Sequence, residues 1–133
     1  MDYRKIILIV VALIPLSELV SNLYGLFFAL ESYAATVGIS AADERIRLII
    51  LCVLDLAAGV PLLLFLKDAG NRQMPMISLV GFALYALYQI VSAFVQLEGT
   101  ASSIALSGGI AYLLIGVLGF YISKRINQFP KIA

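Results

Sequence analysis

Four long runs that contain almost no charged residue constrain this chain more than any other feature of its sequence. They cover residues 6–30, 48–66, 73–97 and 99–123. The only charged residues inside them are Glu18 in the first run and Asp55 in the second. Each run is 19 or 25 residues long, and about 20 apolar residues suffice for a helix to cross a bilayer. Because the runs do not alternate apolar with polar residues as membrane strands do, we expect four transmembrane helices.

The composition also favours a membrane protein over a soluble one. Of the 133 residues, 62% are hydrophobic and 13% are charged, whereas soluble domains are about half apolar and a quarter charged. The first run is longer than the apolar segment of a signal peptide, so we interpret it as a retained span. The length allows one domain over residues 1–133. We therefore predict an all-α, integral membrane four-helix bundle, with helices at about residues 5–30, 42–66, 75–97 and 101–124.

Local sequence signals indicate where these helices begin. Ser40 and Asp43 have the spacing of a capping box, which predicts a helix that begins near Ala41 and whose first turns project above the bilayer. Pro75 suits the first turn of the third helix. The segment 31–40 contains a glycine and several small residues, and we interpret it as the one longer loop.

The distribution of Lys and Arg predicts the orientation. One side of the predicted bundle carries seven basic residues, namely Arg4, Lys5, Lys67, Arg72, Lys124, Arg125 and Lys131. The other side carries only Arg45 and Arg47. Because cytoplasmic loops carry the excess of positive residues, we expect both termini in the cytoplasm. The expected location is the cell membrane, inner or plasma, with the chain crossing it several times.

Polar residues inside the spans are the second informative feature, because such residues are costly in hydrocarbon and often mark functional sites. Glu18 and Asp55 lie near the middle of the first two spans. Depth and helical face predict one layer of seven polar side chains near the middle of the membrane, made of Glu18, Asn22, Asp55, Tyr85, Tyr88, Gln89 and Tyr112. These are the candidate substrate- or ion-binding residues.

The two acids need a positive partner or a proton. An ionised carboxylate at this depth costs about 2.5–3.5 kcal/mol, and no Lys or Arg lies inside the uncharged runs. The acids are therefore protonated, share a bound cation, or are reached by water through a cavity. Pro15 and Pro61 each free a backbone carbonyl one turn earlier, at Val11 and Ala57 respectively. Such carbonyls beside a carboxylate are suited to bind a cation.

The same polar residues also have a purely structural interpretation. Hydrogen bonds between membrane helices contribute about 0.6 kcal/mol each on average, and this role is favoured for Asn22, Gln89 and the serines. For the tyrosines the two interpretations are balanced. Glu18 and Asp55 are the residues most expected to function, because an acid is rarely used only to join helices.

Small residues in the last span predict close helix packing. Ala105, Gly109 and Gly116 let helix backbones approach each other, either within one bundle or between copies in a homo-oligomer. The expected partners are the lipid bilayer and either further copies of this chain or another membrane protein. Nucleic acid is not expected, because a net charge of +1 provides no concentrated basic face.

Three functions fit these observations. The first is a proton- or cation-coupled transporter or channel that uses Glu18 and Asp55. Its plan of four short spans with a glutamate in the first is similar to that of small multidrug resistance transporters, although this chain has no Trp, a longer outer loop and a second acid. The second is a structural or accessory subunit of a larger membrane complex.

The third function is a lipid-modifying membrane enzyme, which would use the two carboxylates for acid–base chemistry. The sequence contains no histidine and a single cysteine, Cys52, so it lacks the commonest metal ligand and any pair of thiols. We predict no catalytic residues, no metal site and no cofactor.

Overall fold

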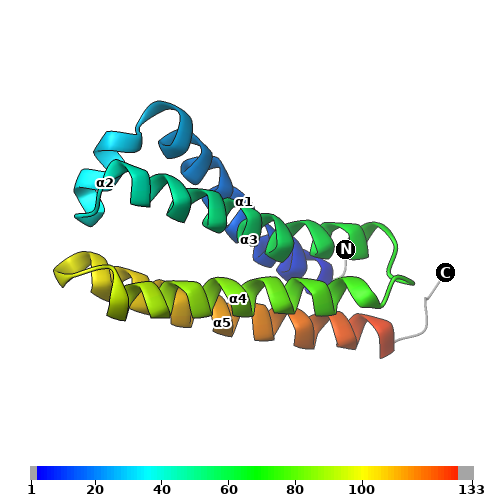
Figure 1. Ribbon diagram of the computed structural model, residues 1–133. Helices are drawn as coiled ribbons and strands as arrows, with labels where there is room; N and C mark the ends of the chain where they lie inside the picture. Colours follow the sequence, from blue (N-terminus) through cyan, green and yellow to red (C-terminus); the bar gives the residue numbers. More distant parts are fainter. Residues whose placement is uncertain (1–2, 129–133) are drawn as a thin grey trace.

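The computed structural model describes residues 3–128, which form five α-helices (Figure 1). These are α1 (Tyr3–Phe28), α2 (Leu30–Val37), α3 (Ala41–Lys67), α4 (Gln73–Val95) and α5 (Gly99–Gln128). All except α2 are long and apolar enough to cross a membrane, and there is no strand within residues 3–128. The prediction of an all-α membrane protein with four spans is confirmed. Phe129 to Ala133, which include Lys131, lie outside the described residues.

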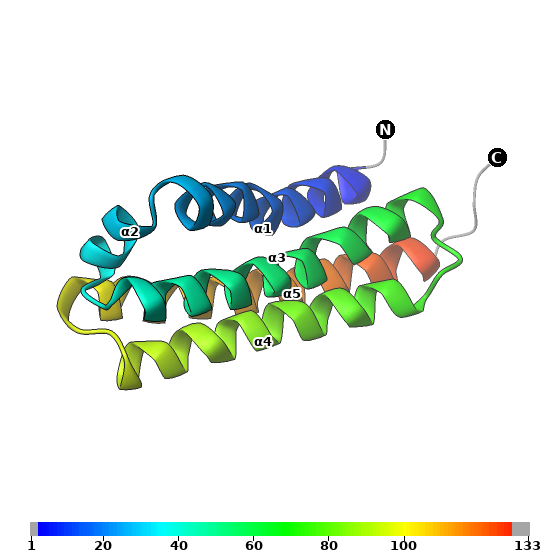
Figure 2. The same ribbon diagram turned by 45° about the horizontal axis from the view of Figure 1, so that its top comes forward.

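The four long helices run antiparallel to their neighbours in the chain and form a bundle. Helix α1 packs on α3, α3 on α4 and α4 on α5, while a smaller contact between α5 and α1 closes the bundle. Helix α1 begins and α5 ends at the same end of the molecule (Figure 2). A chain that crosses a membrane four times must begin and end on the same side, as these helices do. That this end faces the cytoplasm stays a prediction from the positive residues.

The segment expected as a loop is mostly helical, so that expectation was wrong. Residues 30–37 form α2, which is separated from α1 by Ala29 with φ −142°. The helix ends at Gly38, whose φ of 79° lies in the left-handed region that glycine tolerates best. Gly38, which we interpreted as part of a loop, marks the end of a short helix.

Helix α2 is held against the end of α1 by a tyrosine. The Tyr33 hydroxyl donates a hydrogen bond to the Ser21 carbonyl oxygen at 3.0 Å. Its ring lies against Gly25, where an added Cβ would collide with the ring carbons. The absence of a side chain at Gly25 therefore allows the sharp turn between the two helices.

The predicted helix starts agree with the structure to within about two residues. Ser40 is the N-cap of α3, and its Oγ accepts a hydrogen bond from the Asp43 amide nitrogen at 3.2 Å. The helix begins at Ala41 as expected, and Pro75 lies in the first turn of α4. At its end, α5 continues to Gln128, four residues beyond the predicted end.

The outer surface of the bundle is apolar, as contact with lipid requires. Large side chains such as Phe28, Phe94 and Val95 are between 76% and 80% exposed. The interior contains buried aliphatic and aromatic residues, including Leu8, Phe65 and Phe82. In a soluble protein this much exposed apolar surface would cause association, so lipid is the environment that fits it.

Glycines let the helices approach closely and set their rotation. An added Cβ at Gly81 would lie 2.6 Å from the Ala57 carbonyl carbon, and Cβ atoms at Gly109 and Gly116 would also meet α4. Both of these α5 glycines therefore serve packing within the bundle, one of the two roles left open by the sequence. Nearby, the Ser78 hydroxyl donates to the Ala58 carbonyl oxygen at 2.6 Å.

Candidate functional site

Glu18 on α1 is held by two tyrosine hydroxyls inside the bundle. Tyr85 on α4 donates to Glu18 Oε1, and Tyr112 on α5 donates to Glu18 Oε2. The two tyrosine rings stack with their centroids 4.0 Å apart, and both rings are almost fully buried. One carboxyl group therefore joins three of the four spans.

Asp55 on α3 is the second acid of the site and is fully buried. The Asn22 side-chain nitrogen donates to Asp55 Oδ2 at 3.0 Å. Asn22 lies one turn after Glu18 on α1, so the same face of α1 contributes to both acids. The Asp55 carboxyl group interacts electrostatically with Glu18 and lies near the Tyr112 hydroxyl. The two acids thus belong to one polar cluster.

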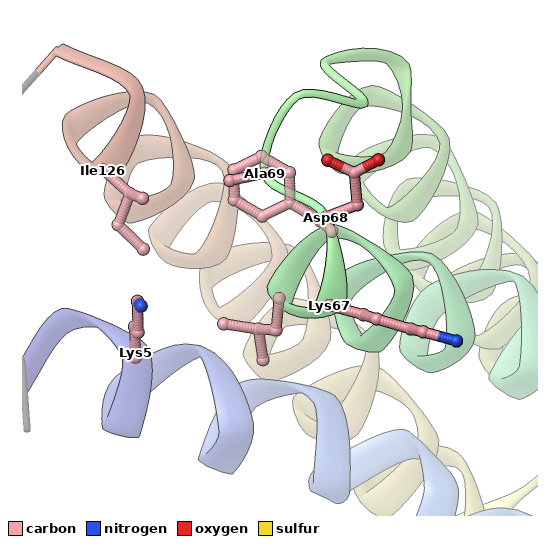
Figure 3. Close-up of a pocket in the computed structure, with 7 residues that line it drawn as sticks. Lys5, Lys67, Asp68, Ala69 and Ile126 are labelled. Atoms are coloured by element: carbon pink, nitrogen blue, oxygen red, sulfur yellow. The ribbon is translucent and has the colours of Figure 1, made fainter. Parts of the chain in front are cut away.

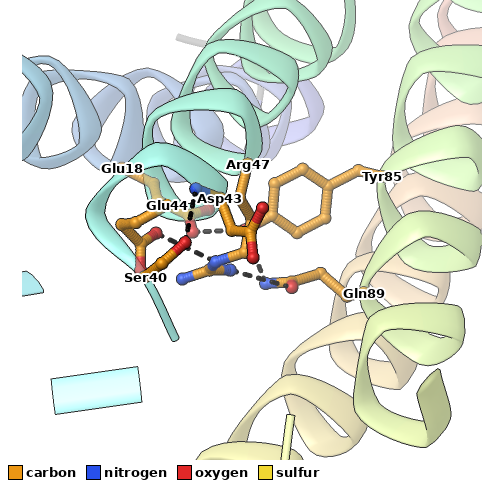
Figure 4. A network of polar contacts seen from close by, with 7 residues as sticks. All are labelled: Glu18, Ser40, Asp43, Glu44, Arg47, Tyr85 and Gln89. Atoms are coloured by element: carbon orange, nitrogen blue, oxygen red, sulfur yellow. Dashed lines mark hydrogen bonds and ion pairs between the residues drawn. The ribbon is translucent and has the colours of Figure 1, made fainter. Parts of the chain in front are cut away.

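A chain of hydrogen bonds extends from Glu18 toward the start of α3 (Figure 4). The Gln89 side-chain nitrogen donates to the Tyr85 hydroxyl at 3.2 Å. Arg47 Nη1 donates to Gln89 Oε1 at 3.4 Å, and Arg47 Nε donates to Glu44 Oε1 at 3.0 Å. Each donor between Arg47 and Glu18 points toward Glu18, so the chain is oriented head to tail.

Glu44 and Arg47 also belong to this cluster, although Arg47 was expected on the helix turns that project above the bilayer and Glu44 was not among the candidate residues. Both lie within α3, and their side chains are 0% and 11% exposed respectively. No basic residue lies inside the four runs, but Arg47, just before the second run, reaches the site through its side chain. Glu44, Arg47, Leu51 and Asp55 are three or four residues apart, which places them on one helix face. From this spacing alone, Glu44 and Arg47 could have been predicted to lie on the same helix face as Asp55.

The structure brings six of the seven predicted site residues together. These are Glu18, Asn22, Asp55, Tyr85, Gln89 and Tyr112. The seventh, Tyr88, is partly buried against the hydrophobic core, where its hydroxyl lies near Ser92 and interacts electrostatically with Arg47 and Glu44. Whether these residues bind a substrate or an ion stays a prediction.

The carbonyl that Pro61 frees is covered by a neighbouring helix. A Cβ at Gly81 of α4 would lie 2.8 Å from the Ala57 carbonyl oxygen. A cation could bind this oxygen only if α3 and α4 moved apart. Within residues 3–128, no three His, Cys, Asp or Glu side chains are grouped closely enough to hold a metal ion.

A separate cavity of about 160 Å³ lies where α1 begins and α3 ends (Figure 3). It is lined by Lys5, Phe65, Leu66, Lys67, Asp68, Ala69 and Ile126. The Lys67 side chain extends away from Lys5, so the two charges do not converge (Figure 3). None of the predicted site residues lines this cavity, and we do not include it in the site.

Comparison with known proteins identified no relative of this chain. No protein-family model, no curated protein and no solved structure matches it. The chemistry of the polar cluster is therefore the basis for the function proposed below.

Proposed function

We propose that this protein is a small transporter or channel that moves protons or a small cation across the cell membrane, with Glu18 and Asp55 as the binding site. The observation that supports this proposal is the meeting of two acids from α1 and α3 in the interior of an apolar bundle. Each acid is bound directly by neutral donors: Tyr85 and Tyr112 at Glu18, and Asn22 at Asp55.

Neutral donors suit an exchange site better than a permanent ion pair does. A hydrogen bond from a hydroxyl or an amide stabilises a carboxylate, but it leaves the negative charge uncompensated and able to attract a positive ion. An acid that served only to join helices would be more stable with a basic partner in direct contact, or if replaced by an apolar residue. Within residues 3–128, Glu18 and Asp55 have no basic partner in direct contact, and they are not replaced by apolar residues. Their presence therefore favours reversible binding of a cation or proton.

We further propose that the protein acts as a homo-oligomer in the cell membrane. A single bundle of four helices is narrow, and its interior is largely filled by the side chains described above. Helices α1 and α5 bury only 28% of their most apolar segment, compared with 50% for α3 and 44% for α4. The outer faces of α1 and α5 are therefore the surfaces on which a second copy would pack.

An accessory subunit is the second candidate, and one observation favours it. Glu18 is only partly buried, so a basic residue of a partner membrane protein could approach it. Asp55, by contrast, is 0% exposed, and a partner could not contact it without separating the helices. The subunit function therefore accounts for one acid, whereas a transport site uses both.

The test is ion flux into liposomes that contain the purified protein. We expect wild-type protein to carry protons or a monovalent cation down an imposed gradient, and Glu18→Gln and Asp55→Asn to reduce this flux to the level of empty liposomes. Glu31→Gln is the matched control, because Glu31 is an exposed acid on α2, outside the polar cluster.

Each variant must first give the same elution volume and unfolding transition as the wild type. Wild-type flux that survives in Glu18→Gln and Asp55→Asn would refute the proposed site. A wild-type protein that moves none of the tested ions would refute transport. Copurification with a second membrane protein, lost in Glu18→Gln, would then support the accessory subunit.

A further inference from the structure

We infer that the ion bound at this site is a single proton, which is carried by Asp55 while Glu18 stays ionised. This inference deepens the proposed function and rests on it for the link to transport. The hydrogen-bond donors around the four carboxyl oxygens, together with the burial of the two acids, indicate where the proton lies.

Three of the four oxygens already face a donor. Glu18 Oε1 and Oε2 accept from Tyr85 and Tyr112, and Asp55 Oδ2 accepts from Asn22. Asp55 Oδ1 is buried and has no hydrogen-bond partner among the described residues. Leaving a buried carboxylate oxygen without a donor is unfavourable, because the oxygen has lost its water and gained no hydrogen bond in return. A proton on Asp55 Oδ1 removes the charge that needed this donor and creates an O–H group beside Glu18, the acid with which Asp55 interacts.

A metal cation does not suit this arrangement of donors. Ca²⁺ binds 6–8 oxygens and Mg²⁺ needs a complete octahedral shell, so the ligand oxygens must turn free lone pairs toward one point. Here hydroxyl and amide hydrogens are directed at three of the carboxyl oxygens. The carbonyl oxygen of Ala57, one of the two backbone ligands suggested by the sequence, is covered by α4. A proton needs only the one free oxygen.

The direction of the hydrogen bonds assigns the charge to Glu18. The chain from Arg47 through Gln89 and Tyr85 consists of donors that all point toward Glu18. Hydrogen bonds in such a chain polarise one another, and a guanidinium at its head increases the effect. Glu18 receives a second hydroxyl from Tyr112. More donors stabilise the charged form, so the carboxylate charge belongs on Glu18.

Burial assigns the neutral form to Asp55. Its side chain is 0% exposed, whereas Glu18 is partly exposed, and the penalty for removing a charge from water is larger for the more buried group. The titratable groups that face Asp55 are Glu18 from α1, Tyr85 from α4 and Tyr112 from α5, with Cys52 one turn earlier on α3. None of these four is a cation, so release of the proton leaves two adjacent acids without direct compensation.

Infrared spectroscopy of the purified protein in lipid tests the assignment without any transport assay. A protonated carboxyl group has a C=O stretching band separate from the carboxylate bands. At neutral pH we expect such a band in the wild type, its loss in Asp55→Asn and its retention in Glu44→Gln. Glu44 is the matched control, because it is an equally buried acid on the same helix and also has one oxygen, Oε2, without a hydrogen-bond partner among the described residues, but its other oxygen is paired with the Arg47 guanidinium.

Isotope labelling gives the same answer without a variant, in case Asp55→Asn does not fold. Carbon-13 at the aspartate side-chain carboxyl should shift the band, and carbon-13 at the glutamate carboxyl should not. Among the described residues, Asp55 is the one buried aspartate, and burial is what favours the protonated form, so an aspartate band at neutral pH is assigned to it. A band that shifts with the glutamate label, or no band at neutral pH, would overturn the assignment.

These outcomes separate the inference from the proposed function. An aspartate band in a protein that conducts no ion would refute transport and leave the proton on Asp55. Sodium-driven flux in a protein without that band would refute the proton and leave transport.

Discussion

Replacing Gly81 with alanine is expected to destabilise the bundle because α3 and α4 touch there through their backbones. The new Cβ would lie 2.6 Å from the Ala57 carbonyl carbon and 2.7 Å from the Ala58 amide nitrogen. Backbone atoms cannot rotate away, so α4 must shift by about 0.8 Å to reach an ordinary contact of 3.4 Å. Overpacking of this kind costs about 1–3 kcal/mol. The shift would also strain the 2.6 Å hydrogen bond between Ser78 Oγ and the Ala58 carbonyl oxygen.

The same shift should reach the polar cluster. Tyr85 lies one turn beyond Gly81 on α4, so its hydroxyl moves relative to Glu18 when α4 moves away from α3. We therefore expect Gly81→Ala to reduce ion flux as well as stability. If Gly81→Ala lowered stability without any change in flux, the close packing of α3 against α4 would not be needed for ion transport.

The assay is reversible unfolding in mixed micelles with increasing SDS, followed by circular dichroism. Gly108→Ala is the matched control, because a Cβ at Gly108 meets nothing within 4 Å. Adding this methyl group should leave stability unchanged or raise it by up to about 0.5–1 kcal/mol, since glycine is unfavourable within a helix. Equal unfolding midpoints for Gly81→Ala and Gly108→Ala would refute the close packing of α3 against α4.

Three further predictions concern the side chains of the site and its surroundings. Tyr85→Phe and Tyr112→Phe should each cost about 1–3 kcal/mol, and a double-mutant cycle in the unfolding assay should be non-additive because both hydroxyls bind Glu18. Arg47→Ala should cost about 3–5 kcal/mol because it leaves Glu44 buried without its partner, and Glu44→Gln in the same protein should recover most of this loss in thermal melts. Tyr33→Phe should cost about 0.5–1.5 kcal/mol and leave flux unchanged; altered flux would include α2 in the transport site.

The spans could be predicted from the sequence because the thickness of the bilayer and the cost of burying charge leave few alternatives. The layer of polar residues followed from the same logic, since depth depends only on position along a helix. The rotation of each helix about its own axis was harder to predict from the sequence. It depends on contacts such as Gly81 against Ala57, which join residues distant in the sequence.

Helix α4 illustrates this limit. With 3.6 residues per turn, Gln89 lies about 40° around the helix from Tyr85, whereas Tyr88 lies about 60° away on the other side. A polar helix face assigned from the sequence therefore includes all three residues. Packing places Tyr85 and Gln89 in the hydrogen-bond chain that ends at Glu18, whereas Tyr88 lies near Ser92 and interacts with Arg47 and Glu44.

Two features were missed for different physical reasons. Helix α2 depends on Tyr33 closing over Gly25, a tertiary contact that no local pattern encodes. Arg47 was expected outside the bilayer because it precedes the uncharged run of α3, and Glu44, which lies still earlier on the helix, was not considered as a site residue. Their side chains nevertheless reach into the bundle, because long polar side chains near a helix end can extend along it.

The most direct test of this account is whether Glu18 contacts the two tyrosines in a bilayer. Solid-state NMR of the protein in lipid, with carbon-13 at the glutamate carboxyl and at the tyrosine ζ carbon, detects such proximity. We predict correlations from Glu18 to both Tyr85 and Tyr112, one lost in each Tyr→Phe variant and both lost in Glu18→Gln. Correlations that are absent from the wild type, or that persist in Glu18→Gln, would contradict the site.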